Sequence, residues 1–150
     1  MAGCLFLDLF AGSGAVGIEA LSRDGEKAVF VEQNRQAQKV IEDNLRLTGL
    51  FDQAVVFPLP VDRALKILAR QGEQFDLIFL GAPYDSPDLE GALAILGQGQ
   101  YLKPKGLVIA EHRRQHQLAD SFGCLQAKRE NRYGETTLTF YEESNIPREL

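Results

Sequence analysis

The segment CLFLDLFAGSGAVGIEALSR, residues 4–23, decides the fold of this chain. An apolar run of strand-forming residues ends at Phe10, and a helical pattern begins near Gly14. Gly12, Gly14 and Gly17 give the spacing GxGxxG across that junction. Glycines let a ligand approach the backbone closely, and the free amides of a helix start offer it hydrogen bonds. The segment therefore predicts a nucleotide-type ligand on a strand-to-helix turn.

Strand and helix patterns alternate on both sides of this segment, which is typical of a parallel sheet covered on both faces. The predicted strands are residues 4–10, 28–32, 53–59, 75–80 and 106–111, and the predicted helices lie near residues 14–23, 34–47, 62–70 and 88–96. Residues 124–130 and 136–143 are separated by only five residues, which suits an antiparallel hairpin. We expect residues 1–150 to form a single α/β domain.

Composition narrows the class of protein. The chain has 150 residues, 45% of them hydrophobic, and a net charge of -5. No apolar run is long enough to cross a bilayer, so we expect a soluble, cytoplasmic protein without a membrane partner. An acidic chain does not coat nucleic acid by bulk attraction, so any contact with RNA must be local. We expect the two cysteines, Cys4 and Cys124, to be buried thiols.

Glu32 follows Gly12 by twenty residues, at the end of the second predicted strand. A carboxylate at this place can accept hydrogen bonds from the two hydroxyls of a ribose. The alternative is a tight turn without a ligand, beside a solvated Glu32.

Three features favour an adenosyl ligand over NAD. Asp8 lies on the first strand itself, four residues before Gly12; its alternative role is a buried carboxylate held by backbone amides. Asp62 follows the third strand, where it can accept from an adenine amino group, or else cap a helix. The terminal hairpin is the third feature, because dinucleotide-binding sheets are usually all parallel.

Six segments together resemble the bacterial methyltransferases that modify guanine N2 of small-subunit ribosomal RNA: DLFAGSGAVGIEALSR, FVEQN, NLRLTG, FDLIFLGAPY, LKPKGLVIAEH and RYGETTLTFY. The similarity spans essentially the whole chain. It implies a Rossmann-like class I methyltransferase fold, with a seven-stranded, mostly parallel sheet that ends in an antiparallel hairpin. It also implies S-adenosylmethionine as cofactor, no metal, and ribosomal RNA, within a small-subunit particle, as the partner.

The same resemblance assigns site residues. Around the methionine and ribose it implies Asp8 and the backbone of Phe10, Ala11, Gly12, Ser13 and Gly14. It places Glu32 on the ribose, and Val61 and Asp62 near the adenine.

Two departures from the family stand out. The family usually carries Asp-Pro-Pro-Tyr after the fourth strand, where this chain has Gly81, Ala82, Pro83 and Tyr84. These four are the predicted catalytic residues; Gly81 offers only a carbonyl oxygen, and Tyr84 can stack on an unpaired base. Without the carboxylate we expect slow methyl transfer, or a cofactor-binding homologue that serves as an interaction module. The family also starts earlier, with a basic segment and a hairpin, whereas this sequence enters directly at the first strand.

His112 and His116 have the i, i+4 spacing of a metal pair, but no third ligand is evident. We expect both to be solvated loop histidines.

Overall fold

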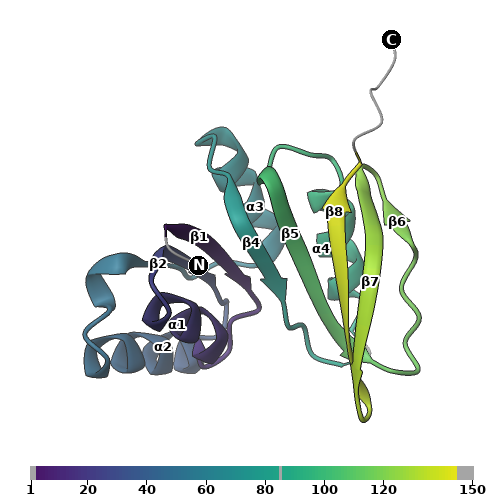
Figure 1. Ribbon diagram of the computed structural model, residues 1–150. Helices are drawn as coiled ribbons and strands as arrows, with labels where there is room; N and C mark the ends of the chain where they lie inside the picture. Colours follow the sequence, from purple (N-terminus) through teal and green to yellow (C-terminus); the bar gives the residue numbers. More distant parts are fainter. Residues whose placement is uncertain (1–2, 85, 145–150) are drawn as a thin grey trace.

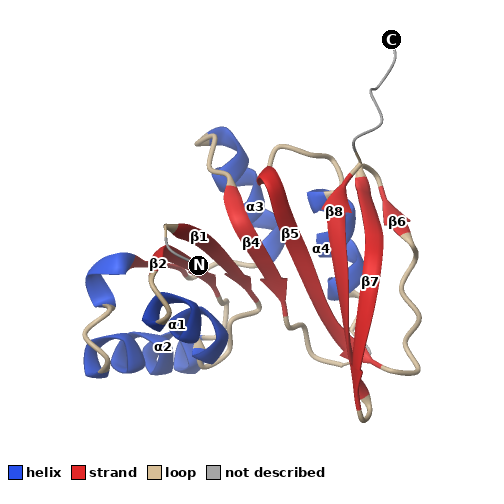
Figure 2. Ribbon diagram, viewed as in Figure 1, coloured by secondary structure: helices blue, strands red, loops and turns tan. Residues whose placement is uncertain are grey.

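The computed structural model describes residues 3–84 and 86–144, which form one mixed sheet flanked by helices (Figures 1 and 2). The strands are β1 (Cys4–Leu9), β2 (Gly25–Val31), β3 (Ala54–Phe57), β4 (Phe75–Leu80), β5 (Leu102–Arg113), β6 (Ser121–Phe122), β7 (Leu125–Tyr133) and β8 (Thr136–Glu143). The helices are α1 (Ala15–Ser22), α2 (Arg35–Leu47), α3 (Val61–Arg70) and α4 (Asp88–Leu96), with a 3-10 turn at Phe51–Gln53.

The strand order is β3-β2-β1-β4-β5-β8-β7-β6. Strands β1 to β5 are parallel, whereas β8 lies antiparallel to β5, and β7 antiparallel to β8. The predicted α/β class, with a parallel core and a C-terminal antiparallel hairpin, is confirmed. The sheet has eight strands in the described residues and not the expected seven, because Ser121–Phe122 pairs with the outer edge of β7. Two residues are too short for any periodicity to reveal.

The helices cover opposite faces of the sheet, as the pleat of β1 requires. Phe6 packs with residues of α1 and α2 in one apolar cluster. Leu7 and Leu9 point the other way and pack with α3 and α4 in a second, larger cluster. In Figure 1, α1 and α2 lie beside β1 and β2, whereas α3 and α4 lie behind β4, β5 and β8. No helix in the described part of the chain is long and apolar enough to cross a membrane.

Gly17 allows α1 to lie close against the sheet. A Cβ atom at this position would be 2.7 Å from Cζ of Phe30 and 3.2 Å from Oδ2 of Asp8. Phe30 is fully buried within the apolar cluster that α1 and α2 cover. The packing of α1 on β2 therefore requires a residue without a side chain here.

We expect Gly17→Ala to lower the free energy of unfolding by about 1–3 kcal/mol, the usual cost of overpacking. Alanine normally stabilises a helix interior by up to about 1 kcal/mol relative to glycine. Gly91→Ala in α4 is the matched control, because nothing lies within 4 Å of a Cβ there, and it should be stabilising. Urea unfolding of both variants measures the difference, and changes of the same sign would contradict this packing argument.

Candidate functional site

A cleft of about 670 Å³ lies where β1, β2, β3 and β4 end, and the first turn of α4 forms part of its wall. The sheet order reverses between β1 and β4, since β2 lies on one side of β1 and β4 on the other. Ligands of open α/β sheets bind outside the carboxyl ends of the strands at such a switch point. The cleft also has the volume typical of small-molecule sites.

The predicted turn forms one wall of the cleft. Phe10 and Gly12 both line it, and both have a positive φ, 61° and 58°. This backbone region is unfavourable for a phenylalanine and free for a glycine. Nothing lies within 4 Å of a Cβ built on Gly12, so the absence of a side chain leaves open space there. Ala11, Ser13 and Gly14 belong to the same turn but are not among the residues that line the cleft.

Glu32 lines the cleft and is held in place by two backbone amides. Its Oε1 accepts from the amide of Gly12 at 2.7 Å, and its Oε2 accepts from the amide of Asn34 at 3.0 Å. Glu32 is therefore held by the backbone, although its side chain remains partly exposed. Each carboxylate oxygen can accept more than one hydrogen bond, so both remain available to a ligand. The side chain joins the turn after β1 to the turn after β2.

Asp8 does not line the cleft. Its side chain is 2% exposed beneath α1, where Oδ2 accepts from the amide of Gly17 at 3.2 Å. Burial raises the pKa of this carboxyl to about 8; the Gly17 hydrogen bond opposes the shift, and the charge of Glu32 adds to it. The structure places Asp8 as the buried, amide-bonded carboxyl of the alternative interpretation, supporting the start of α1 from below.

Val61 and Asp62 line the opposite side of the cleft, at the first turn of α3. The N-cap of α3 is Pro60, so the alternative interpretation of Asp62 as the helix cap is wrong. Asp62 is exposed and lies one residue inside the helix. Its carboxylate is thus close to the free amides of a helix start and to the cleft at once.

The predicted catalytic residues divide between cleft and core. Gly81 and Pro83 line the cleft, whereas Ala82 is 5% exposed within the large apolar cluster. Tyr84 is 40% exposed, and its hydroxyl is 2.7 Å from the hydroxyl of Thr136 at the start of β8. The guanidinium carbon of Arg113 lies 4.8 Å from the centre of the Tyr84 ring. The loop after β4 is therefore tied to β5 and β8.

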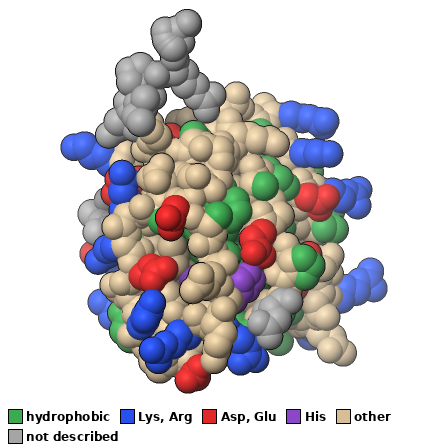
Figure 3. All heavy atoms as spheres, turned by 90° about the vertical axis from the view of Figure 1, so that its right-hand side faces the viewer, with side chains coloured by type: hydrophobic (Ala, Val, Ile, Leu, Met, Phe, Trp, Pro, Cys, Tyr) green, Lys and Arg blue, Asp and Glu red, His purple; other side chains and the backbone are tan. Residues whose placement is uncertain are grey.

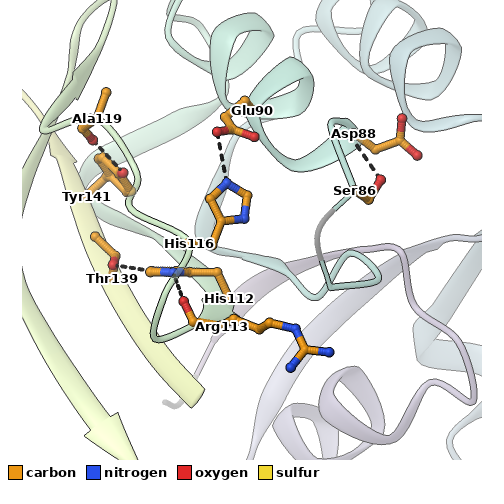
Figure 4. A network of polar contacts seen from close by, with 9 residues as sticks. All are labelled: Ser86, Asp88, Glu90, His112, Arg113, His116, Ala119, Thr139 and Tyr141. Carbon is orange, nitrogen blue, oxygen red and sulfur yellow. Dashed lines mark hydrogen bonds and ion pairs between the residues drawn. The ribbon is translucent and has the colours of Figure 1, made fainter. Parts of the chain in front are cut away.

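The expectation of solvated loop histidines is wrong for His112. It lies inside β5 and is 4% exposed, because β8 pairs with β5 as far as Arg113. Its Nδ1 is 2.9 Å from the backbone carbonyl oxygen of Arg113, and its Nε2 is 2.7 Å from the hydroxyl of Thr139. His116 follows β5, and its Nε2 is 2.9 Å from a carboxylate oxygen of Glu90 on α4 (Figure 4). Among the described residues no group of metal ligands forms around this pair.

Sequence reasoning missed several residues of the cleft. Gln33, Asp88 and Gly91 line it, the last two on α4. Gln33 could have been predicted, because it directly follows Glu32 in the sequence. The contribution of α4 had no signal in the sequence, because it depends on how the helix packs against α3 and the sheet.

The residues 1–142 match the family model described as Conserved hypothetical protein 95. The Bacillus subtilis protein named "Putative rRNA methyltransferase YlbH" is 38% identical over 136 residues, which cover 91% of this chain and 74% of that protein. Ribosomal RNA small subunit methyltransferase D of Haemophilus influenzae is 35% identical over 108 residues, or 70% of this chain. The chain spans 54%, about half, of the length of that relative.

A solved structure described as "Putative methyltransferase yhhF from Escherichia coli" superposes with a TM-score of 0.80 and 26% identity. The superposition covers 95% of this chain and 77% of that one. The fold and the relatives confirm the resemblance to the ribosomal RNA methyltransferases that the sequence motifs indicated. By its match over residues 1–142, this chain belongs to the family described as Conserved hypothetical protein 95.

Proposed function

We propose that this chain transfers a methyl group from S-adenosylmethionine to the exocyclic N2 amine of a guanine in small-subunit ribosomal RNA. The observation that carries the proposal is the cleft at the switch point, where Glu32 braces the open turn at Gly12 and Gly81 lies at the end of β4. Relatives named as ribosomal RNA methyltransferases support the choice of substrate.

The residues of the cleft fit the cofactor. The backbone at Gly12 gives close approach, since a Cβ there would fill open space. Glu32 can accept from both ribose hydroxyls while it keeps its two backbone amides. Asp62 can accept from the adenine amino group, and Val61 offers apolar contact to the ring. Asp8 acts at one remove, by holding the amide of Gly17 at the start of α1.

S-adenosylmethionine, when bound, supplies a methyl group already activated by a sulfonium sulfur. The protein's part is then to position the amine in line with that methyl group and to accept its N–H. Pro83 and the carbonyl oxygens of the loop after β4 form the side of the cleft where this amine would lie. Tyr84 is 40% exposed and could stack on an unpaired base.

The RNA is recognised within a small-subunit particle rather than free. The chain has a net charge of -5, so it has little bulk attraction for naked RNA. Figure 3 shows the end of the molecule at β6 and β7. On this face, acidic side chains lie between the lysines and arginines, so the positive charge is interrupted. Contacts in a preformed particle can supply the affinity that charge does not.

We expect methyl transfer to the small-subunit particle to be at least about tenfold faster than to the same RNA free in solution. Methyl-labelled S-adenosylmethionine and nuclease mapping of the label measure both rates and identify the modified base. Comparable rates on the two substrates would contradict recognition in the particle. Label on a base other than guanine would contradict the proposed acceptor.

A second candidate is a cofactor-binding homologue without catalysis, which Gly81 and Ala82 favour because the family usually has Asp-Pro there. Calorimetric titration with S-adenosylhomocysteine and with NAD tests a third possibility, a dinucleotide-binding domain. Such a domain would bind NAD, whereas both candidates above would bind S-adenosylhomocysteine. Tight binding of S-adenosylhomocysteine without label transfer to the particle would support this second candidate.

A further inference from the structure

Glu111 brings a carboxylate to the position that Gly81 leaves empty. The β4 and β5 ladder ends with the pair of Leu80 and Ala110, so Gly81 and Glu111 follow side by side. A Cβ atom built on Gly81 would lie 3.4 Å from Oε1 of Glu111 and 3.0 Å from Cε2 of Phe79. The carboxylate of Glu111 thus occupies the space beside the first carbon of any side chain at residue 81.

The carboxylate of Glu111 is partly buried and makes no hydrogen bond or ion pair with any residue that the structure describes. Two other glutamates differ in this respect, since Glu32 accepts from the amides of Gly12 and Asn34, and Glu90 contacts His116. Partial burial without a donor is costly for an ionised group. A donor from a bound ligand would remove that cost.

Glu111 does not line the large cleft itself but lies beside Gly81, which does. It lines a small recess together with Pro83 and Tyr84. Pro83 lines the large cleft as well, together with Gly81. Pro83 belongs to both linings, so Glu111 lies close to the loop after β4, where the amine is expected.

We propose that Glu111 is a catalytic residue that accepts a hydrogen bond from the amine receiving the methyl group, in place of the acidic side chain absent at position 81. This inference rests on the proposed function. As the amine nitrogen bonds to the methyl carbon, the carbon–sulfur bond breaks and its electron pair stays on sulfur. The nitrogen must then lose one proton, which Glu111 accepts and passes to water. Methyl transfer therefore does not depend on a side chain at Gly81.

Single-turnover methylation of the small-subunit particle tests the role of Glu111. We expect Glu111→Ala to slow transfer by about 30- to 1000-fold, as for the loss of a charged transition-state contact, and Glu111→Gln to be intermediate. Affinity for S-adenosylhomocysteine should not change in either variant. Glu142→Ala on β8 is the matched control, because that glutamate is exposed on a strand away from the cleft.

The double variant Gly81→Asp/Glu111→Ala should transfer methyl at least about tenfold faster than Glu111→Ala alone, because it returns a carboxylate to the same space. In the wild-type background the same change places two carboxylates side by side and should give little gain. If the double variant is folded, as judged by urea unfolding, and its rate stays low, then a carboxylate at residue 81 does not replace that of Glu111. This result would overturn the inference.

A binding measurement gives a readout that does not need turnover. Guanosine and inosine monophosphates differ only in the exocyclic 2-amino group, so NMR titration of the protein loaded with S-adenosylhomocysteine isolates the contact to that amine. Wild type should prefer the guanosine form, and Glu111→Ala should lose the preference.

If wild type methylates guanine in the particle and Glu111→Ala is as fast and as selective, the inference is overturned and the proposed function stands. If wild type binds S-adenosylhomocysteine but neither methylates the particle nor prefers the guanosine form, the proposed function fails, and the inference fails with it.

Discussion

Asp8→Asn should remove most of the pH dependence of stability between about pH 4 and pH 8. The pKa of Asp8 is raised from 3.8 to about 8, chiefly by burial. Between these values the folded protein holds a proton at Asp8 that the unfolded chain has lost. The free energy of unfolding therefore falls as the pH rises, by ~1.4 kcal/mol per pH unit. The stabilising contribution is complete below pH 3.8 and is lost as the pH passes about 8.

The expected loss in wild type from pH 5 to pH 8 is ~4 kcal/mol from this one group. Asparagine keeps an oxygen that can accept from the amide of Gly17, so the contact under α1 survives without the titration. Urea unfolding at several pH values measures the slopes for wild type, Asp8→Asn and the exposed control Asp52→Asn. Equal slopes in wild type and Asp8→Asn would mean that Asp8 stays ionised in the folded protein.

Glu32→Ala should weaken binding of S-adenosylhomocysteine by ~30- to 150-fold, or about 2–3 kcal/mol, as for lost hydrogen bonds to a charged group. Glu32 is placed to act twice, because the carboxylate that faces the cleft also holds the amide of Gly12. On the proposed function, its removal takes two hydrogen-bond acceptors from the ribose, and it also removes the hydrogen bond that holds the amide of Gly12. Isothermal titration calorimetry measures the affinity directly.

Two variants separate these contributions. Glu32→Gln keeps one oxygen for the amide of Gly12 and the shape of the side chain, so an intermediate affinity is expected. Gln33→Ala is the matched control on the same segment, because it lines the cleft without a carboxylate and should have a much smaller effect. Unchanged affinity in Glu32→Ala would remove Glu32 from the site.

The positions of the cofactor turn and of Glu32 were predictable because both depend on local sequence. Glycines at a strand-to-helix junction and a carboxylate at the next strand end keep their places in any parallel sheet of this kind. The outcome for Asp8 was less direct. Its place on β1 was predicted, but the pleat turns the side chain toward α1 and away from the cleft.

The end of β5 was misjudged for a similar reason. His112 and Arg113 are polar, and polarity after an apolar run normally signals a loop. Pairing with β8 extends the strand through both residues and buries His112 against Thr139. That partner lies 27 residues further along the chain, so no local pattern announces it.

The sequence by itself determined the α/β class, the turn at Gly12 and the place of Glu32, because each follows from periodicity or from short-range spacing. It also indicated the family, through the resemblance of its motifs. Only the tertiary structure decided that α4 completes the cleft, and that Glu111 on β5 lies beside Gly81 on β4. These are contacts between elements distant in sequence, fixed by the register of neighbouring strands and the packing of helices on the sheet. That residue 81 is a glycine is visible in the sequence, whereas its neighbour Glu111 is known only from the pairing of β4 with β5.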